Sequence, residues 1–468
     1  MAVYDLDHMD IWEPHEAAPA EEPKKIKKKR PIGLWIVIVL LMSALIAEPF
    51  VIEFLRDDPV SIVHSEINVN GELVVYYSDG FVQNLGKVVG ADGQDGADGM
   101  DGQDGQNGTN GSDGITTSTN NVAAAASKGL RSAVSVWCTF YRTGWHGVLE
   151  EYYSAGSGVI YRINKAEGDA FIITNYHVVF DAASRMSNGI AEDITLYLYG
   201  SEIAGKEIKA TYVGGSQNYD IAVLRVEDSE VLRQSQATAA TVANSDDVMV
   251  GSTAIAVGNP EGGGISASSG VISVDSEHIS MIAADGKTEV SYRVMRIDTA
   301  VNSGNSGGGL YDEQGSLIGI VNAKTVDEEV ENIGYALPST TVVAVADNII
   351  DFCFGTTCES VRRPIMGVTV VTKDSSATYD ETTGKVTIVE RVEIYEVSPG
   401  QIGAVFQPGD VLVSVTLREQ TYQITRQHHV IDRMMTARVG DVVQFVVLRS
   451  GVETILTVTI TEGCLTAY

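Results

Sequence analysis

Basic residues are scarce in this chain of 468 residues: 32 lysines and arginines stand against 62 aspartates and glutamates, and the formal net charge is −30. Nucleic-acid phosphates are bound through basic surface, so this balance argues against a nucleic-acid partner. Cysteine is also rare, with four residues and no C-x-x-C pair. That scarcity argues against a zinc ribbon or a dithiol redox site. No cofactor or metal is implied by the sequence.

Two of the cysteines are close in sequence. Cys353 and Cys358 flank the short segment "FGTT" and are spaced for a local disulfide in an oxidising compartment. Four unpaired thiols are the alternative, and the sequence leaves both open.

Long apolar runs are few, and the main one lies near the amino terminus. "PIGLWIVIVLLMSALIA" (31–47) holds no charged residue, and "KKIKKKR" (24–30) precedes it. Its length is at the short end for a membrane helix, and a basic flank stays on the cytoplasmic side. We therefore predict a cytoplasmic tail over 1–30, a single-pass transmembrane anchor over 31–50, and the rest of the chain outside the cytoplasm, at the cell membrane.

A cleaved signal peptide is the alternative for this segment. Cleavage after Ala47 would put Leu45 at the −3 position, where small residues are usual. We favour the uncleaved anchor for that reason.

Proline is absent from a stretch in which glycine recurs at every third position. Residues 66–89 first present two β-rich runs around Ser78-Asp79-Gly80, which predicts a hairpin. The spacer 90–114, "GADGQDGADGMDGQDGQNGTNGSDG", then repeats the Gly-X-Y pattern of a collagen triple helix. Its aspartates repel one another and it lacks proline, so a flexible linker is equally consistent.

Short β-rich runs separated by Gly, Asn and Asp turns fill residues 122–355, as in "AFIITNYHVV", "IAVLRV" and "LIGIVNA". This texture predicts an all-β barrel or sandwich. One helix is predicted near its end, starting at Ser339 and stopping by Gly355.

The segment 302–310, "NSGNSGGGL", lacks the lysine of a phosphate-binding loop. It fits G-x-S-x-G, but three glycines after Ser306 oppose the helix that an α/β-hydrolase elbow requires.

Histidines that could serve Ser306 as a base are few, and His177 follows a strong β-run. Asp220 precedes another. The order His177, Asp220, Ser306 is that of the chymotrypsin-type triad.

The motifs "TNYHVV", "DIAVLRV", "AVGNP", "GNSGGGL" and "IGYALPS" occur in this order. With them the chain resembles the HtrA/DegP-type serine proteases. The resemblance implies a chymotrypsin-like double β-barrel over 122–355, with His177 as general base, Asp220 as orienting acid and Ser306 as nucleophile. It also implies an oxyanion hole made by the backbone N–H groups of Gly304 and Ser306. Glycine fits that role because it tolerates unusual φ/ψ and leaves room for the substrate oxygen.

The family commonly has proline where this chain has Ser303 and Gly309, which removes no catalytic group. Ala300 stands six residues before Ser306, where trypsin-like enzymes that cleave after basic residues carry a carboxylate. The resemblance therefore implies a small or medium apolar residue before the cleaved bond. The strand 319–323 is expected in the pocket wall.

Residues 361–462 resemble a PDZ domain, with "RPIMGV" as the carboxylate-binding loop and "VSPGQIGAVFQPGDVLVSV" as the more specific match. The resemblance places a peptide-binding loop at Ile365, Met366, Gly367 and Val368, beside a helix that starts near His428 and His429. An extended peptide would add a strand to the sheet edge there. An ordinary β-rich domain is the alternative.

Together these features predict a mainly β, membrane-anchored serine endopeptidase with a PDZ domain. Its expected partners are unfolded or misfolded proteins and C-terminal peptides, and the resemblance implies a homotrimer active in protein quality control. A non-catalytic surface protein that presents a PDZ head on a collagen-like stalk is the rival hypothesis.

Overall fold

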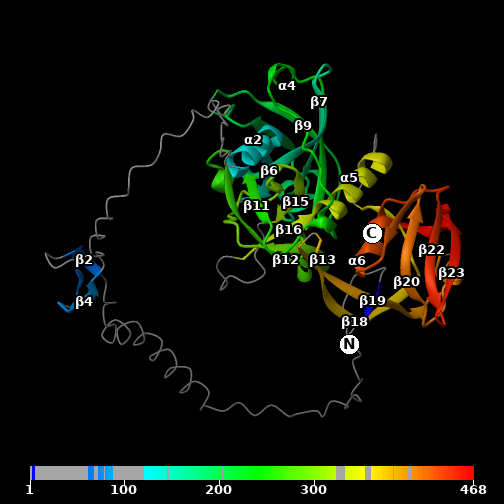
Figure 1. Cartoon of the computed structure of the whole chain (residues 1–468). Helices are drawn as coiled ribbons and strands as arrows, with labels where there is room; N and C mark the ends of the chain where they lie inside the picture. Colours follow the sequence, from blue (N-terminus) through cyan, green and yellow to red (C-terminus); the bar gives the residue numbers. More distant parts are fainter. Residues whose placement is uncertain are drawn as a thin grey trace, which may run out of the picture. The chain divides into compact units, whose positions relative to one another are not determined.

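The computed structural model of the chain divides into two compact units, Met1–His15 with Ile115–Tyr468, and Glu16–Gly114 (Figure 1). The structure describes residues 3–5, 62–67, 72–78, 80–87, 121–144, 147–202, 204–322, 333–353, 360–382, 384–398, 400 and 402–467.

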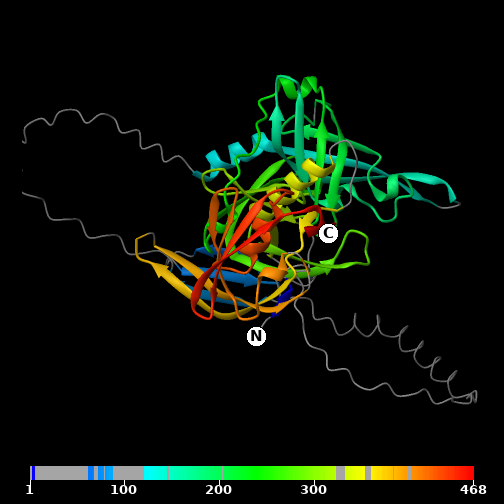
Figure 2. The same ribbon diagram turned by 90° about the vertical axis from the view of Figure 1, so that its right-hand side faces the viewer.

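The first β-barrel of the larger unit closes in the order β10-β7-β6-β5-β8-β9. Its strands are β5 (Ala133–Thr143), β6 (Leu149–Asn164), β7 (Asp169–Thr174), β8 (Asp193–Leu198), β9 (Ile208–Ser216) and β10 (Ile221–Val226). All five aliphatic residues of "IAVLRV" in β10 are buried, because the strand lies against the barrel core. Figure 2 shows the cyan β5–β6 hairpin extending from this barrel.

The second barrel closes in the order β11-β12-β13-β16-β15-β14. Its strands are β11 (Thr253–Gly258), β12 (Ser266–Ile282), β13 (Glu289–Ile297), β14 (Gly309–Tyr311), β15 (Leu317–Asn322) and β16 (Gly334–Pro338). Two closed barrels confirm the prediction of a mainly β, trypsin-like fold.

Five α-helices lie in the described part of the chain: α2 (Asn121–Ser132), α3 (Tyr176–Val179), α4 (Glu230–Gln234), α5 (Ser339–Cys353) and α6 (His428–Met435). Short 3-10 turns are η2 (Ser187–Gly189), η3 (Ser245–Asp247), η4 (Pro260–Gly262), η5 (Gly403–Val405) and η6 (Glu462–Cys464). The predicted helix is present as α5. Helix α2 was not predicted, although its alanine-rich segment favours a helix.

The C-terminal part forms a sheet in which β18-β19-β20-β22-β23 are neighbours and β21 pairs with β20. The strands are β18 (Val368–Asp380), β19 (Lys385–Val397), β20 (Val411–Leu417), β21 (Gln420–Gln423), β22 (Val442–Arg449) and β23 (Val452–Thr459), and β17 (Arg362–Pro364) pairs separately with β24 (Leu465–Ala467). One hydrophobic cluster includes Ile255 of the second barrel, Val345 of α5 and Phe445 of β22. The protease-like barrels and this sheet therefore share a core.

At the β18 edge of this sheet, β1 (Val3–Asp5) pairs with residues 369–371 of β18. The predicted anchor and the predicted spacer 90–114 lie outside the described residues. No helix among the described residues is long and apolar enough to cross a membrane.

The smaller unit contains a three-stranded antiparallel sheet, β2 (Ile62–Ile67), β3 (Glu72–Tyr77) and β4 (Val82–Lys87). The predicted hairpin corresponds to β3 and β4, and β2 adds a third strand. In the larger unit Cys138 and Cys464 are buried and form no disulfide. Cys353 is disulfide-bonded, and its predicted partner Cys358 lies outside the described residues.

Candidate active site

His177 and Asp220 face each other, although 43 positions separate them in the chain. The Nδ1 atom of His177 is 2.7 Å from Oδ2 of Asp220. The backbone N–H of His177 also donates to Oδ1 of Asp220 at 3.0 Å. One carboxylate oxygen therefore holds the backbone of His177, and the other sets the orientation of the imidazole and favours the tautomer with a proton on Nδ1.

Local structure positions this pair. The sequence suggested that a strand end presents His177, but the residue lies in the one-turn helix α3 that follows β7. The amide of Asn175 and the N–H of Tyr176 both donate to the Asp220 carbonyl, at 2.8 and 3.2 Å. Asp220 itself has a positive φ of 51°. The start of α3 is thus hydrogen-bonded to Asp220, the same residue whose carboxylate orients His177.

The Ser306 turn is built on two glycines with positive φ, Gly304 at 91° and Gly307 at 83°. A Cβ atom on Gly304 would lie 2.3 Å from the Asn259 carbonyl oxygen, and one on Gly307 would lie 2.2 Å from the Ser157 carbonyl oxygen. Both positions therefore require glycine for conformation and for space.

Strand β6 of the first barrel and the segment after β7 contact this turn. The Ser157 N–H donates to the Ser306 carbonyl at 2.9 Å, and the Ser157 hydroxyl donates to the Gly304 carbonyl at 2.6 Å. A Cβ on Gly307 would also come within 3.0 Å of the Asn175 nitrogen. The turn that carries Ser306 accordingly packs against the segment just before His177.

The peptide between Ser303 and Gly304 has a defined orientation. The Ser303 carbonyl accepts a hydrogen bond of 2.7 Å from the Glu261 N–H. Within the described residues, the Gly304 N–H donates to no backbone carbonyl. This N–H can therefore donate a hydrogen bond to an oxygen atom of a bound ligand, which is the chemistry expected of an oxyanion hole.

Two further residues at this site, Asn322 and Tyr292, had no recognisable signal in the sequence. The Asn322 amide of β15 donates to Oδ2 of Asp220 at 3.0 Å, and it also lies 2.9 Å from the Tyr292 hydroxyl. The strand 319–323 was expected only as a pocket wall. Asparagine in a buried strand does not by itself indicate such a contact.

The predicted peptide-binding loop, 365–368, leads into β18. Ile365 is exposed, Met366 and Val368 are buried, and Gly367 has a positive φ of 64°. Helix α6 begins at His428, as expected for the neighbouring helix, but His428 is buried.

One group could in principle hold a metal ion, since ligand atoms of Asp246, His428 and His429 lie within 4.8 Å of one another. However, Arg293 and Arg433 already donate to the two Asp246 oxygens, at 3.0 and 2.8 Å. Burial, and then the charge of Arg293, hold the pKa of His428 well below its ordinary value. Surroundings that disfavour one added positive charge disfavour a divalent cation more strongly.

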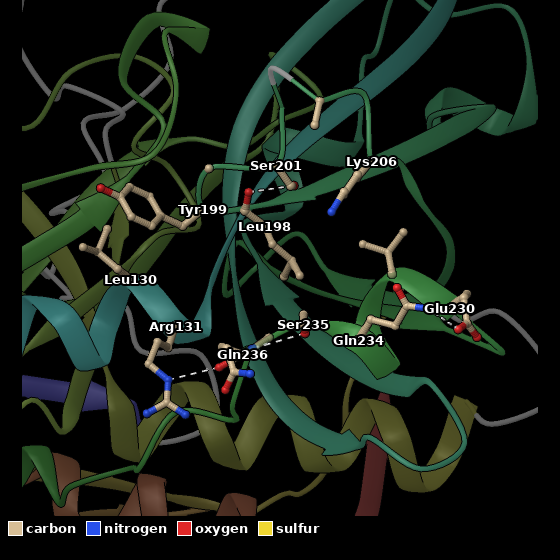
Figure 3. Close-up of a pocket in the computed structure, with 14 residues that line it drawn as sticks. Leu130, Arg131, Leu198, Tyr199, Ser201, Lys206, Glu230, Gln234, Ser235 and Gln236 are labelled. Atoms are coloured by element: carbon tan, nitrogen blue, oxygen red, sulfur yellow. Dashed lines mark hydrogen bonds between the residues drawn. The ribbon is translucent and has the colours of Figure 1, made fainter.

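A pocket of about 440 Å³ lies elsewhere, on the first barrel beside α2 and α4 (Figure 3). Leu198, Tyr199 and Lys206 are on one side, and Arg131 and Gln236 are on the other. None of the predicted site residues lines it.

Residues 156–320 match the family model of the trypsin-like peptidase domain. This match and the two barrels agree on the class of fold: residues 156–320 are similar to a trypsin-like peptidase domain.

More particularly, that part of the chain is similar to HtrA proteases. Serine protease Do-like HtrA of Lactococcus lactis subsp. cremoris (strain MG1363) is 33% identical over 273 residues, which cover 56% of this chain and 60% of the relative. Serine protease Do-like HtrA of Bacillus subtilis (strain 168) is 31% identical over 308 residues, 64% of this chain and 62% of the relative. The chain thus spans about three fifths of the length of these curated relatives.

Among solved structures, the HtrA-type protease AlgW with decapeptide is similar with a TM-score of 0.44 and 24% identity, covering 74% of this chain and 98% of that one.

Proposed function

We propose that this protein is a serine endopeptidase of the HtrA type, in which His177, Asp220 and Ser306 form the catalytic triad. The observation that carries the proposal is the 2.7 Å contact between His177 Nδ1 and Asp220 Oδ2. It leaves the other imidazole nitrogen to act as a base. The glycine-built turn of Ser306 packs against the same segment.

The proposed reaction is acyl transfer to Ser306 followed by hydrolysis. His177 takes the hydroxyl proton as Ser306 attacks the peptide carbonyl, and it then gives that proton to the leaving amine. Asp220 remains ionised and stabilises the imidazolium. The N–H groups of Gly304 and Ser306 stabilise the oxyanion that forms on the carbonyl oxygen. Water then repeats the sequence with His177 as its base and releases the acid.

The substrates we propose are unfolded or exposed protein segments with a small or medium apolar residue before the cleaved bond. Ala300, six residues before Ser306, offers no charge to a basic side chain. Do-like HtrA relatives support the protease class.

Fluorophosphonate labelling of the full chain tests the catalytic assignment, because such probes react only with an activated serine. We expect labelling and casein cleavage by the wild type and by the control Ser280→Ala, whose side chain is exposed on β12. Ser306→Ala and His177→Ala should lose both. Labelling of Ser306→Ala at the wild-type level would refute the assignment, and an unlabelled wild type would favour the non-catalytic alternative.

We further propose that 361–462 is a PDZ domain that captures C-terminal peptides in the loop 365–368 and along the edge of β18, where the peptide would take the place of β1. A peptide with a free carboxylate should bind and its amidated form should not, since backbone N–H groups of such a loop recognise the charge. Equal binding of the two peptides would contradict this role.

The membrane anchor over 31–50 also remains a proposal, with the catalytic and C-terminal parts outside the cytoplasm. Asp5→Cys gives a direct test in intact cells. An impermeant thiol reagent should leave this cysteine unlabelled if residues 1–30 are cytoplasmic. Labelling would instead place it in the compartment of β18, with which β1 pairs.

A further inference from the structure

We infer that Asn322 is a positioning residue of the proposed triad, because its amide holds Asp220 from the opposite barrel. The inference rests on the proposed function. Asp220 Oδ2 is contacted from two sides, by His177 Nδ1 at 2.7 Å and by Asn322 Nδ2 at 3.0 Å. The carboxylate oxygen that faces the imidazole is therefore fixed by a residue 102 positions later in the chain.

The orientation of the Asn322 amide follows from its partners. A carboxylate only accepts hydrogen bonds, so the NH₂ group must face Asp220. The same nitrogen is 2.9 Å from the Tyr292 hydroxyl, and that hydroxyl in turn donates to the Met281 sulfur. Tyr292 thus has its lone pairs toward Asn322, and the two amide protons serve two acceptors. In the flipped orientation, the amide oxygen of Asn322 would face the carboxylate of Asp220, and two acceptors would be in contact.

Strand β15 connects the acid to the nucleophile. Val321, directly before Asn322, accepts from the Gly307 N–H at 3.0 Å and donates to the Gly308 carbonyl at 2.8 Å. Adjacent residues of one strand thus hold the Ser306 turn and the Asp220 carboxylate. Because Asp220 belongs to the first barrel and β15 to the second, this strand sets the acid against the nucleophile across the junction of the barrels.

The contact between Asn322 and Asp220 is buried, so its loss should be costly. Asn322 and Tyr292 are each 1% exposed and Asp220 is 6% exposed. Water cannot readily replace a donor lost at such a place. The titratable groups in contact with Asp220 are His177 on α3 and, through Asn322, Tyr292 on β13. Burial, and then the Asp220 charge, raise the pKa of Tyr292 well above its ordinary value, so it stays neutral. Within the described residues no lysine or arginine forms an ion pair with Asp220.

These contacts predict a particular kinetic effect of Asn322→Ala. The N–H that faces Asp220 offsets part of the carboxylate charge. Without it, the carboxylate attracts the His177 proton more strongly, and protonated His177 cannot act as a base. The acid limb of the activity–pH profile should therefore move to higher pH, by about 0.5 to 1 unit. A carboxylate free to shift should also lower kcat by about 10- to 100-fold while KM changes little.

The experiment measures kcat, KM and the activity–pH profile of the full chain with a chromogenic peptide. The matched control is Asn348→Ala, which removes an equally buried amide that donates to the Arg362 carbonyl away from the triad. Tyr292→Phe keeps the aromatic ring and removes only the second acceptor of the Asn322 amide. It should lower kcat by about 2- to 5-fold and move the acid limb in the same direction.

Failure of the proposed function and failure of the positioning role give different results. A wild type that neither cleaves peptides nor reacts with fluorophosphonate refutes the proposed function itself. An active wild type whose Asn322→Ala form matches Asn348→Ala in kcat and in acid limb overturns the positioning role. If Asn322→Ala does not fold, Tyr292→Phe decides: wild-type kcat and an unmoved acid limb overturn the inference, and the predicted shift supports it.

Discussion

Arg293 on β13 and Asp432 on α6 form a hydrogen-bonded ion pair between the second barrel and the C-terminal sheet, and both side chains are almost fully buried. Asp246 accepts from Arg293 at 3.0 Å and from Arg433 at 2.8 Å. The Thr341 hydroxyl at the start of α5 donates to Asp432 at 3.0 Å. Paired charges thus join the protease-like part to the C-terminal part in a region closed to water.

Replacing Arg293 should be strongly destabilising. Arg293→Met leaves Asp432 and Asp246 buried without their shared partner, and removal of one member of a buried pair costs about 3–5 kcal/mol. Urea denaturation measures the loss. The control is Arg162→Met, because Arg162 and its partner Asp347 are 47% and 32% exposed, and such pairs contribute about 0–1 kcal/mol. Equal losses in the two variants would show that the Arg293 network contributes no more than a surface pair.

The stability of this junction should fall in mild acid. Burial lowers the pKa of His278 and of His429 to about 4, and it also holds the pKa of His428 well below its ordinary value. Arg293 and Arg426 add to the effect at His278. Unfolded histidine titrates near pH 6.5, so the unfolded state binds protons first. The contribution of these neutral histidines to the free energy of unfolding is fully present above about pH 6.5 and is lost as the pH falls toward 4.

Urea midpoints at pH 7.5 and 5 test this dependence, with an expected loss of at least about 2 kcal/mol. Asp432, whose pKa burial raises, opposes the trend at lower pH, so the upper part of the window is clearest. His429→Gln should flatten the dependence, whereas His64→Gln, at an exposed site, should not. If the stability of His429→Gln depended on pH as steeply as that of the wild type, His429 would be excluded as a source of the pH dependence.

Alanine at Gly307 should cost both stability and activity. The positive φ alone costs about 1–2 kcal/mol for a residue with a side chain, and the new Cβ would overlap the Ser157 carbonyl. Movement of the Ser306 turn should reduce casein cleavage by about 100-fold. Gly400→Ala is the control, because nothing lies within 4 Å of its added Cβ. Near-normal activity in Gly307→Ala would mean that the turn relaxes without moving Ser306.

The proposed trimer and the Gly-X-Y spacer need separate tests. Analytical ultracentrifugation of residues 56–468 should detect a trimer, and a monomer across the micromolar range would contradict it. For residues 66–121, circular dichroism should show a cooperative melt that strengthens with salt, because salt screens the repulsion between aspartates. A featureless coil at every salt concentration would make the segment a linker.

The sequence by itself determined the secondary structure of both barrels and the order of the proposed triad. β-Branched runs such as "IAVLRV" between turn residues form strands for local reasons. The glycines around Ser306 signalled a turn that needs positive φ, and Gly304 and Gly307 have it. Helix α5 was recognisable from apolar residues at helical spacing.

Only the tertiary structure decided which distant side chains meet. Asn322 and Asp220 are 102 positions apart, and Arg293 and Asp432 are 139 apart. Local patterns encode strands, helices and turns through backbone preferences. Contacts between elements depend instead on how barrels, helices and the C-terminal sheet pack together, and no short stretch of sequence carries that information.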